Sequence, residues 1–174
     1  MRFFEANIRH QTTRTMTETK TPKKLMWAEF GFCESDTHAL GVWIQTLQAL
    51  YNGQEGLQPH TTLLYGFESD QAKRVTQAML AVLPCKARIS SIEWGSKAPV
   101  LIARLESETL QKLFAGLYKT VPNQHTLIDG RYDPYLTLLQ LQDGDAIRRP
   151  PPEAIDSLVG SVVTLTSARV AFDQ

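Results

Sequence analysis

A six-residue motif occurs twice in this chain of 174 residues. Segment 59–64 reads PHTTLL, and segment 134–139, which begins 75 positions later, reads PYLTLL, so four of the six residues are identical. Alternate residues of a β-strand project from the same face. Each copy is therefore predicted to present two polar side chains together, while the next leucine anchors the opposite face in the core. The polar pairs are His60 with Thr62 and Tyr135 with Thr137, and the leucines are Leu63 and Leu138.

The surrounding sequence repeats in the same order around both copies. A predicted strand at 25–32 and a helix whose apolar residues recur from Leu40 to Leu50 and Tyr51 precede the first copy. A predicted strand at 100–105 and a helix capped by Ser107 precede the second copy. The motif alone is weak evidence, because Thr and Leu are ordinary strand residues, but the repeated order favours internal duplication. Further predicted elements are a helix at 70–83, a strand at 87–94, a short helix at 153–159 and a β-rich segment at 161–172.

The two motifs resemble those of the two-histidine (2H) phosphoesterases, a family that includes 2′-5′ RNA ligase-like proteins and cyclic phosphodiesterases. The resemblance extends over about residues 25–172. It implies an α+β fold of two duplicated lobes, with antiparallel-rich sheets flanked by helices around a central cleft. His60, Thr62 and Thr137 match the family's H-x-T pattern, whereas Tyr135 stands where the family has its second histidine. The resemblance thus implies catalytic positions at His60 and Tyr135, and phosphate binding by Thr62 and Thr137.

The change from histidine to tyrosine limits the acid–base chemistry of such a site. Hydrolysis of a cyclic phosphodiester needs one group to take a proton from water and another to protonate the leaving oxygen. Two imidazoles, with ordinary pKa values of about 6.5, can divide these roles near neutral pH. A tyrosine ordinarily titrates near pH 10, so it can donate a hydrogen bond or a proton but is a poor base. We therefore expect weak turnover or none, with phosphate binding less affected.

Three further residues are candidates for contact with a phosphate or a base. Arg104 is predicted to share a strand face with Val100 and Ile102, where a phosphate contact and a salt bridge are both open. Arg131 and Tyr132 precede the second motif in a predicted loop from which either could reach a ligand, although a solvated loop is the simpler interpretation.

Aromatic residues and histidines outside the motifs are weaker candidates. Trp94, near a strand end, could stack on a nucleobase, whereas Trp27 and Tyr65 are predicted to pack in the interior. His125 could replace the missing imidazole only if its loop folded back toward the second motif.

Composition and charge narrow the functional classes. The chain has 18 Lys and Arg residues and 18 Asp and Glu residues, which argues against a broad surface for long nucleic acid but not against a small nucleotide or RNA end. With 43% hydrophobic residues, segment 25–174 is predicted to form a single bilobal domain. Residues 1–24 lack sustained periodicity and are predicted to form a flexible arm, whose basic residues could lie near a phosphate.

The cysteine count and hydropathy bear on the compartment. Cys33 and Cys85 lack metal-ligand spacing and fit a reducing cytoplasm, although a single disulfide is also open. The chain has no apolar run of membrane-spanning length and no visible signal peptide. A cytoplasmic protein with no metal and no cofactor is therefore expected, and its oligomeric state is left open.

Three functional classes are compatible with these observations. The first is a hydrolase of cyclic or 2′-5′-linked nucleotide phosphodiesters, and the second is a catalytically inactive protein that binds a nucleotide to sequester or sense it. The third is an interaction protein that has kept only the packing residues of the motif strands. The resemblance favours a phosphate ligand over the third class. Motif spacing does not encode which base or linkage is bound.

Overall fold

The computed structural model of the chain describes residues 25–95, 99–122, 132–141 and 153–172. The predicted arm at 1–24, His125 and Arg131 lie outside the described residues. In chain order the elements are β1 (Leu25–Phe32), α1 (Glu34–Tyr51), β2 (His60–Glu68), the 3-10 helix η1 (Ser69–Gln71), α2 (Ala72–Leu80), β3 (Cys85–Trp94), β4 (Val100–Glu106), α3 (Glu108–Tyr118), β5 (Tyr135–Gln140), the 3-10 helix η3 (Glu153–Leu158) and β6 (Val162–Phe172).

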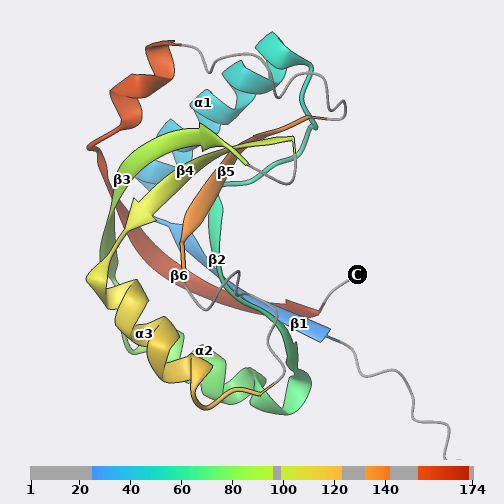
Figure 1. The fold of residues 1–174 in the computed structure, drawn as a ribbon, viewed down its shortest axis with the longest axis vertical. Coiled ribbons are helices and arrows are strands. Elements are labelled where there is room, and N and C mark those ends of the chain that lie inside the picture. The colour runs from blue at the N-terminus through green and yellow to red at the C-terminus, as the bar shows by residue number, and fades with distance from the viewer. Residues whose placement is uncertain (1–24, 96–98, 123–131, 142–152, 173–174) are drawn as a thin grey trace, which may run out of the picture.

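The six strands form one closed antiparallel sheet (Figure 1). Their order around the ring is β1-β2-β5-β4-β3-β6, and each neighbouring pair is antiparallel. Helix α1 lies at one end of the curved sheet, and α2 and α3 lie together at the other end. The expected α+β class, with antiparallel strands flanked by helices, is therefore confirmed.

Strand pairing follows the same pattern in the two halves of the chain. The first half runs β1, α1, β2, α2 and β3, and the second runs β4, α3, β5, η3 and β6. Exchanging β1 with β4, β2 with β5 and β3 with β6 leaves the set of neighbouring strands unchanged. Within a half, β1 pairs with β2 and β4 pairs with β5. The halves are joined by the pairs β2–β5, β3–β4, β3–β6 and β1–β6.

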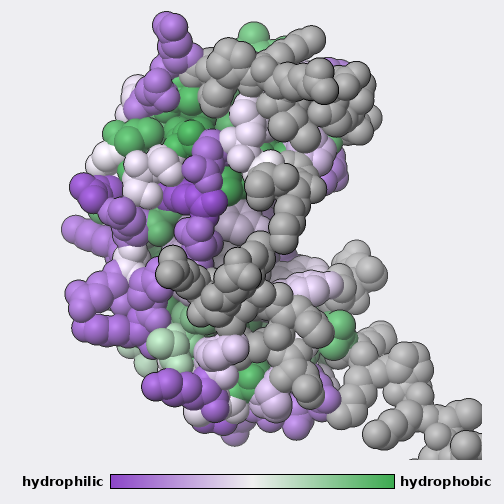
Figure 2. Space-filling model, viewed as in Figure 1, coloured by the Kyte–Doolittle hydropathy of each residue, from purple (hydrophilic) through white to green (hydrophobic). Residues whose placement is uncertain are grey.

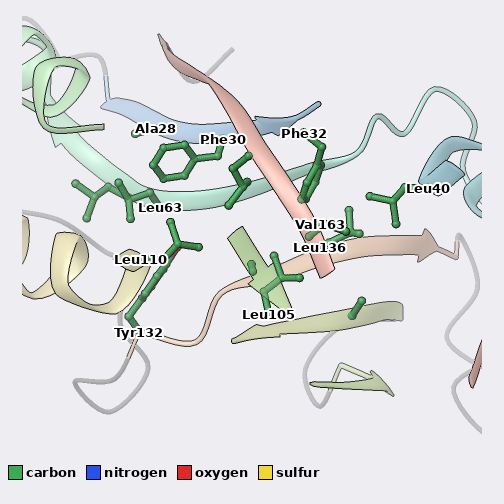
Figure 3. Packing of buried hydrophobic residues seen from close by; sticks show 14 of the residues in the cluster. Ala28, Phe30, Phe32, Leu40, Leu63, Leu105, Leu110, Tyr132, Leu136 and Val163 are labelled. Atoms are coloured by element: carbon green, nitrogen blue, oxygen red, sulfur yellow. The ribbon is translucent and has the colours of Figure 1, made fainter. Parts of the chain in front are cut away.

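One face of the sheet carries the hydrophobic core. Residues of β1 alternate between partly exposed and buried positions, and Ala28 and Phe30 are fully buried. The motif leucines Leu63 and Leu138 are also fully buried, as predicted. Figure 3 shows the core side chains gathered from several strands together with Leu40 of α1 and Leu110 of α3. Burial of each large apolar side chain stabilises the fold by roughly 1.5–3 kcal/mol.

Most predicted elements are present, with changes at their ends. The predicted cap of α3 is confirmed, because the Ser107 side chain accepts a hydrogen bond from the Leu110 N–H at 3.5 Å. The helix predicted at 70–83 is replaced by η1 followed by α2, which ends at Leu80. Pro84 lacks an amide hydrogen and disfavours helical geometry in the residue before it, so the helix ends early. The short helix predicted at 153–159 is the 3-10 helix η3.

The described surface mixes hydrophilic and hydrophobic residues, as Figure 2 shows for one view. Leu50, which the helical spacing placed with the apolar residues of α1, is 64% exposed, while the buried stripe of α1 consists of Leu40, Ile44 and Leu47. Within the described ranges, no helix combines the length and apolar character needed to cross a membrane.

We expect Thr61→Val to leave the free energy of unfolding unchanged or to raise it by about 1 kcal/mol, measured by urea unfolding. Thr61 is fully buried, and its hydroxyl has no hydrogen-bond partner among the described residues. The nearby Tyr132 hydroxyl donates instead to the Thr62 carbonyl oxygen, at 3.2 Å. Valine has the shape of threonine without the polar atom, so the substitution removes an unmet hydrogen-bonding group.

Thr61→Ser is the matched control, because it keeps the hydroxyl and removes only the methyl group. It is expected to destabilise the protein by about 1 kcal/mol through lost apolar burial. A Thr61→Val variant that is less stable than the parent by more than this amount would show that the hydroxyl is hydrogen-bonded.

Candidate functional site

The junction between β2 and β5 brings the two sequence motifs side by side. These strands are joined at Thr61 and Leu136, which are paired residues of an antiparallel ladder and are both fully buried. Their neighbours along each strand point to the opposite face, where directly opposed side chains have Cβ atoms about 4.5–5.5 Å apart. Continuing this register sets His60 beside Thr137 and Thr62 beside Tyr135. The four motif side chains therefore share one face of the sheet.

Registers of the flanking strands extend these pairs into two rows across the sheet, which we call the first row and the second row. Both rows run from β6 through β1, β2, β5 and β4 to β3. The first row contains Ser167, Gly31, His60, Thr137, Ile102 and Glu93. The second row contains Arg169, Glu29, Thr62, Tyr135, Arg104 and Ser91. The site thus draws one residue in each row from every strand.

The His60 imidazole is oriented from both of its nitrogens. Its Nδ1 lies 2.9 Å from the Gln58 carbonyl oxygen, and its Nε2 lies 3.8 Å from Oε2 of Glu29. A carbonyl oxygen can only accept a hydrogen bond, so Nδ1 carries the proton in the neutral ring. This leaves Nε2 as the nitrogen that can take up a proton, and it then becomes the positive partner of the Glu29 carboxylate. The side chain is 38% exposed, so a ligand can reach it.

Glu29 is a site residue that the sequence reasoning missed. Its side chain is only 15% exposed, and Oε2 accepts a hydrogen bond from Nε1 of Trp27 at 3.0 Å. Nη1 of Arg169 lies 3.7 Å from the other carboxylate oxygen. No motif marks Glu29 in the sequence, but alternation along the strand from Trp27 to Gly31 puts it on the polar face. Its contact with His60 depends on the pairing of β1 with β2, which local sequence does not specify.

Arg104 of β4 lies beside the motif residues on the side opposite to Glu29 of β1. It is paired with Tyr135 across the β4–β5 ladder, as its predicted strand face requires. Its guanidinium group contacts Glu93, with Nη2 2.5 Å from Oε1, and also forms an ion pair with Asp133. Of the two alternatives that the sequence left open, the salt bridge is present. A phosphate near Tyr135 would therefore compete with two carboxylates for this guanidinium group.

Tyr132 is buried, and the prediction of a solvated loop position is wrong for this residue. It is 8% exposed, and its ring stacks on Phe114 with centroids 4.4 Å apart. Its hydroxyl donates to the Thr62 carbonyl oxygen at 3.2 Å, and its own carbonyl accepts a hydrogen bond from Gln111. Burial, with a contribution from Cys85, raises the pKa of Tyr132 far above its usual range. Tyr132 therefore supports β2 from the core side.

Two aromatic residues predicted to pack in the interior lie on the polar face instead. The β1–β2 register shifts between Ala28 and Glu29, so Leu63 and Leu64 are both buried and Tyr65 returns to the side of Thr62. Tyr65 is 37% exposed and pairs with Trp27. Period-two alternation counted from His60 failed here because a bulge inserts one extra residue. Trp94, by contrast, is partly buried against the core.

The motif hydroxyl groups remain available to a ligand. The side-chain hydroxyls of Thr62, Thr137 and Tyr135 make no hydrogen bond to another described residue, and Tyr135 is 44% exposed. Within the described ranges no three His, Cys, Asp or Glu residues are grouped to hold a metal ion. What the two rows can offer is hydrogen-bond donors, one imidazole and two guanidinium groups.

Comparison with known proteins adds no assignment. Neither a scan against protein-family models nor a search of curated proteins found a match to this chain. Interpretation of the site therefore depends on its own geometry and chemistry.

We expect Tyr132→Phe to be less stable than the parent near neutral pH but less sensitive to alkaline unfolding. The variant loses the hydrogen bond to the Thr62 carbonyl, which is worth about 1 kcal/mol. The pKa of Tyr132 is raised in the folded parent, so above about pH 10 the unfolded chain releases a proton that the folded chain keeps. The free energy of unfolding of the parent therefore falls as the pH rises through this range, whereas that of Tyr132→Phe does not show this decrease.

Urea unfolding at about pH 8 and about pH 10.5 measures the effect. The difference in free energy of unfolding between parent and variant should narrow at the higher pH. Cys85→Ala serves as a companion variant, because burial also raises the pKa of this thiol. A difference between parent and Tyr132→Phe that stays constant over this interval would contradict the prediction.

Proposed function

We propose that this chain is a 2H-phosphoesterase-like protein that acts on cyclic or 2′-5′-linked nucleotide phosphodiesters. We further propose that turnover is weak, because Tyr135 stands in place of one catalytic histidine. The observation that carries the proposal is the β2–β5 register, which sets His60, Thr62, Tyr135 and Thr137 on one face. The proposed fold is the duplicated two-lobed arrangement of that family. It is supported by the strand pairing, which is the same in both halves.

The proposed reaction uses the imidazole as base and the phenol as acid. Nε2 of His60 takes a proton from a water molecule whose oxygen attacks the phosphorus atom. The bond from phosphorus to the leaving ribose oxygen breaks, and the Tyr135 hydroxyl gives its proton to that oxygen. Proton exchange with solvent then restores both groups. Thr62 and Thr137 donate hydrogen bonds to the remaining phosphate oxygens, which carry the negative charge.

The charge balance around the two rows supports a diester ligand over a monoester. The ion-paired groups comprise the carboxylates of Glu29, Glu93 and Asp133 and the guanidinium groups of Arg104 and Arg169. Carboxylates therefore outnumber guanidinium groups, and the surplus repels anions. A phosphodiester carries one negative charge, whereas a monoester carries roughly 1.5–2 near neutral pH. A phosphodiester is thus repelled less, and protonation of His60 would offset the surplus.

A second candidate function is favoured by one specific observation, the Tyr135 side chain itself. Its hydroxyl can donate to a phosphate oxygen without any change of protonation, whereas a base at this position has to give up its proton. A protein that binds a nucleotide to sequester or sense it would need only this donor, the two threonines and His60. The two candidate functions share one ligand site and differ in whether the bond to phosphorus is broken.

We expect His60→Ala to weaken both binding and any turnover. Removing a positioned acid or base lowers a catalysed rate by about 10²- to 10⁴-fold. The measurements are calorimetric binding and ³¹P NMR assays on a panel of 2′,3′-cyclic mononucleotides and 2′-5′-linked dinucleotides. His38→Ala is the matched control, since His38 is exposed on α1 and lies outside both rows. The proposal fails if folded His60→Ala binds and processes every member of the panel as the parent does.

We expect Tyr135→His to raise the rate of phosphodiester hydrolysis by about 10²-fold or more, because a second imidazole supplies the missing proton transfer. Tyr135→Phe is the companion variant, which removes the hydroxyl and keeps the ring. A parent with measurable turnover that falls in Tyr135→Phe identifies the hydrolase. An inert parent that becomes active only in Tyr135→His identifies the binding protein. If a folded Tyr135→His variant binds the ligand but hydrolyses it no faster than the parent, the side chain at position 135 does not take part in proton transfer.

A further inference from the structure

Gly31 interrupts the first row between two polar side chains. It pairs with His60 of β2 on one side and with Ser167 of β6 on the other. It is the one residue of the two rows that has no side chain. Neighbouring strands lie about 4.8 Å apart, so the space above Gly31 lies beside the base of the His60 side chain. We call this space the Gly31 notch.

The Ser167 hydroxyl points toward the Gly31 notch. A Cβ atom built on Gly31 would lie 2.5 Å from Oγ of Ser167 but 3.9 Å from its Cβ. The hydroxyl thus points from β6 toward the open position above Gly31, which lies between Ser167 and His60 in the first row. Ser167 is exposed, and its hydroxyl has no hydrogen-bond partner among the described residues.

The corresponding place in the other half of the chain is filled. Under the exchange that relates the two halves, Tyr135 takes the place of His60, Arg104 that of Gly31 and Ser91 that of Ser167. The long Arg104 side chain occupies the position that Gly31 leaves open. An open notch beside a hydroxyl therefore occurs only on the histidine side of the two rows.

We propose that the Gly31 notch is a further subsite for a phosphate oxygen, in which the Ser167 hydroxyl donates the hydrogen bond. This inference rests on the proposed function, because it assigns one more contact to the same ligand. A phosphate oxygen accepts hydrogen bonds, and Ser167 supplies a donor in the same row as His60. The missing side chain of Gly31 leaves room for the oxygen between Ser167 and His60.

Two substitutions act on the notch in different ways. Ser167→Ala removes the donor and leaves the space open. Gly31→Ala keeps the donor but fills the space, and the new methyl group forces the Ser167 hydroxyl to rotate away from the 2.5 Å contact. Alanine suits a strand at least as well as glycine, so Gly31→Ala is expected to stay folded. In the double variant the methyl groups fit, because the Ser167 Cβ is 3.9 Å from the new Cβ position.

The test is calorimetric binding of 2′,3′-cyclic AMP to the full chain and its variants. Ser167→Ala and Gly31→Ala are each expected to weaken binding by about tenfold, the typical effect of one hydrogen bond to a charged group. The double variant should bind no more weakly than Gly31→Ala, since both changes remove the same contact. Ser161→Ala, exposed just before β6, is the control and should bind as the parent does.

The outcomes separate this inference from the function on which it rests. If His60→Ala weakens binding while Ser167→Ala and Gly31→Ala bind like the parent, the Gly31 notch is not a subsite and the proposed function stands. If His60→Ala also binds like the parent, the proposed function fails and the subsite fails with it. Weakening by Gly31→Ala alone, with Ser167→Ala unaffected, would overturn the role of the hydroxyl.

Discussion

Everything described for the candidate site depends on the register between β2 and β5. The two strands are held at Thr61 and Leu136, and a shift of one residue would turn either motif to the opposite face. Such a shift would expose Leu136 and bury Tyr135, so burial of the leucine selects the register. A hydrogen bond from the core side also supports this arrangement, because the Tyr132 hydroxyl donates to the Thr62 carbonyl oxygen of β2. Packing of apolar residues thus determines which polar groups meet on the other face.

Polar and apolar alternation accounts for much of what could be predicted from the sequence. It correctly predicted the strand at 25–32, the buried leucines of both motifs and the shared face of Arg104 and Ile102. The capping preference of serine correctly predicted the start of α3 at Ser107. These features are local, since each depends on residues a few positions apart. The order of strands around the ring is not local, and only the repeated motif indicated that two distant strands would be equivalent.

The errors have physical causes that a single sequence does not reveal. A bulge in β2 changes the alternation after Leu63, so Tyr65 and its partner Trp27 lie on the polar face. Tyr132 was predicted to lie in a solvated loop, but stacking on Phe114 draws it into the core. Glu29 was missed because its importance arises from contacts with two other strands. Each error concerns a residue whose position is decided by pairing or packing partners far away in the chain.

The two halves repeat the same pairing pattern, yet the side chains that they contribute have diverged. Arg169 of β6 corresponds to Glu93 of β3, and Gly31 corresponds to Arg104, so related positions carry unlike or opposite charges. If both halves carried the same side chains, the twofold pattern of strand pairing would allow an elongated ligand to bind in either of two orientations. Unlike residues at the two ends of the rows remove that ambiguity. A ligand whose two ends differ therefore has one preferred orientation along the rows, across the strands.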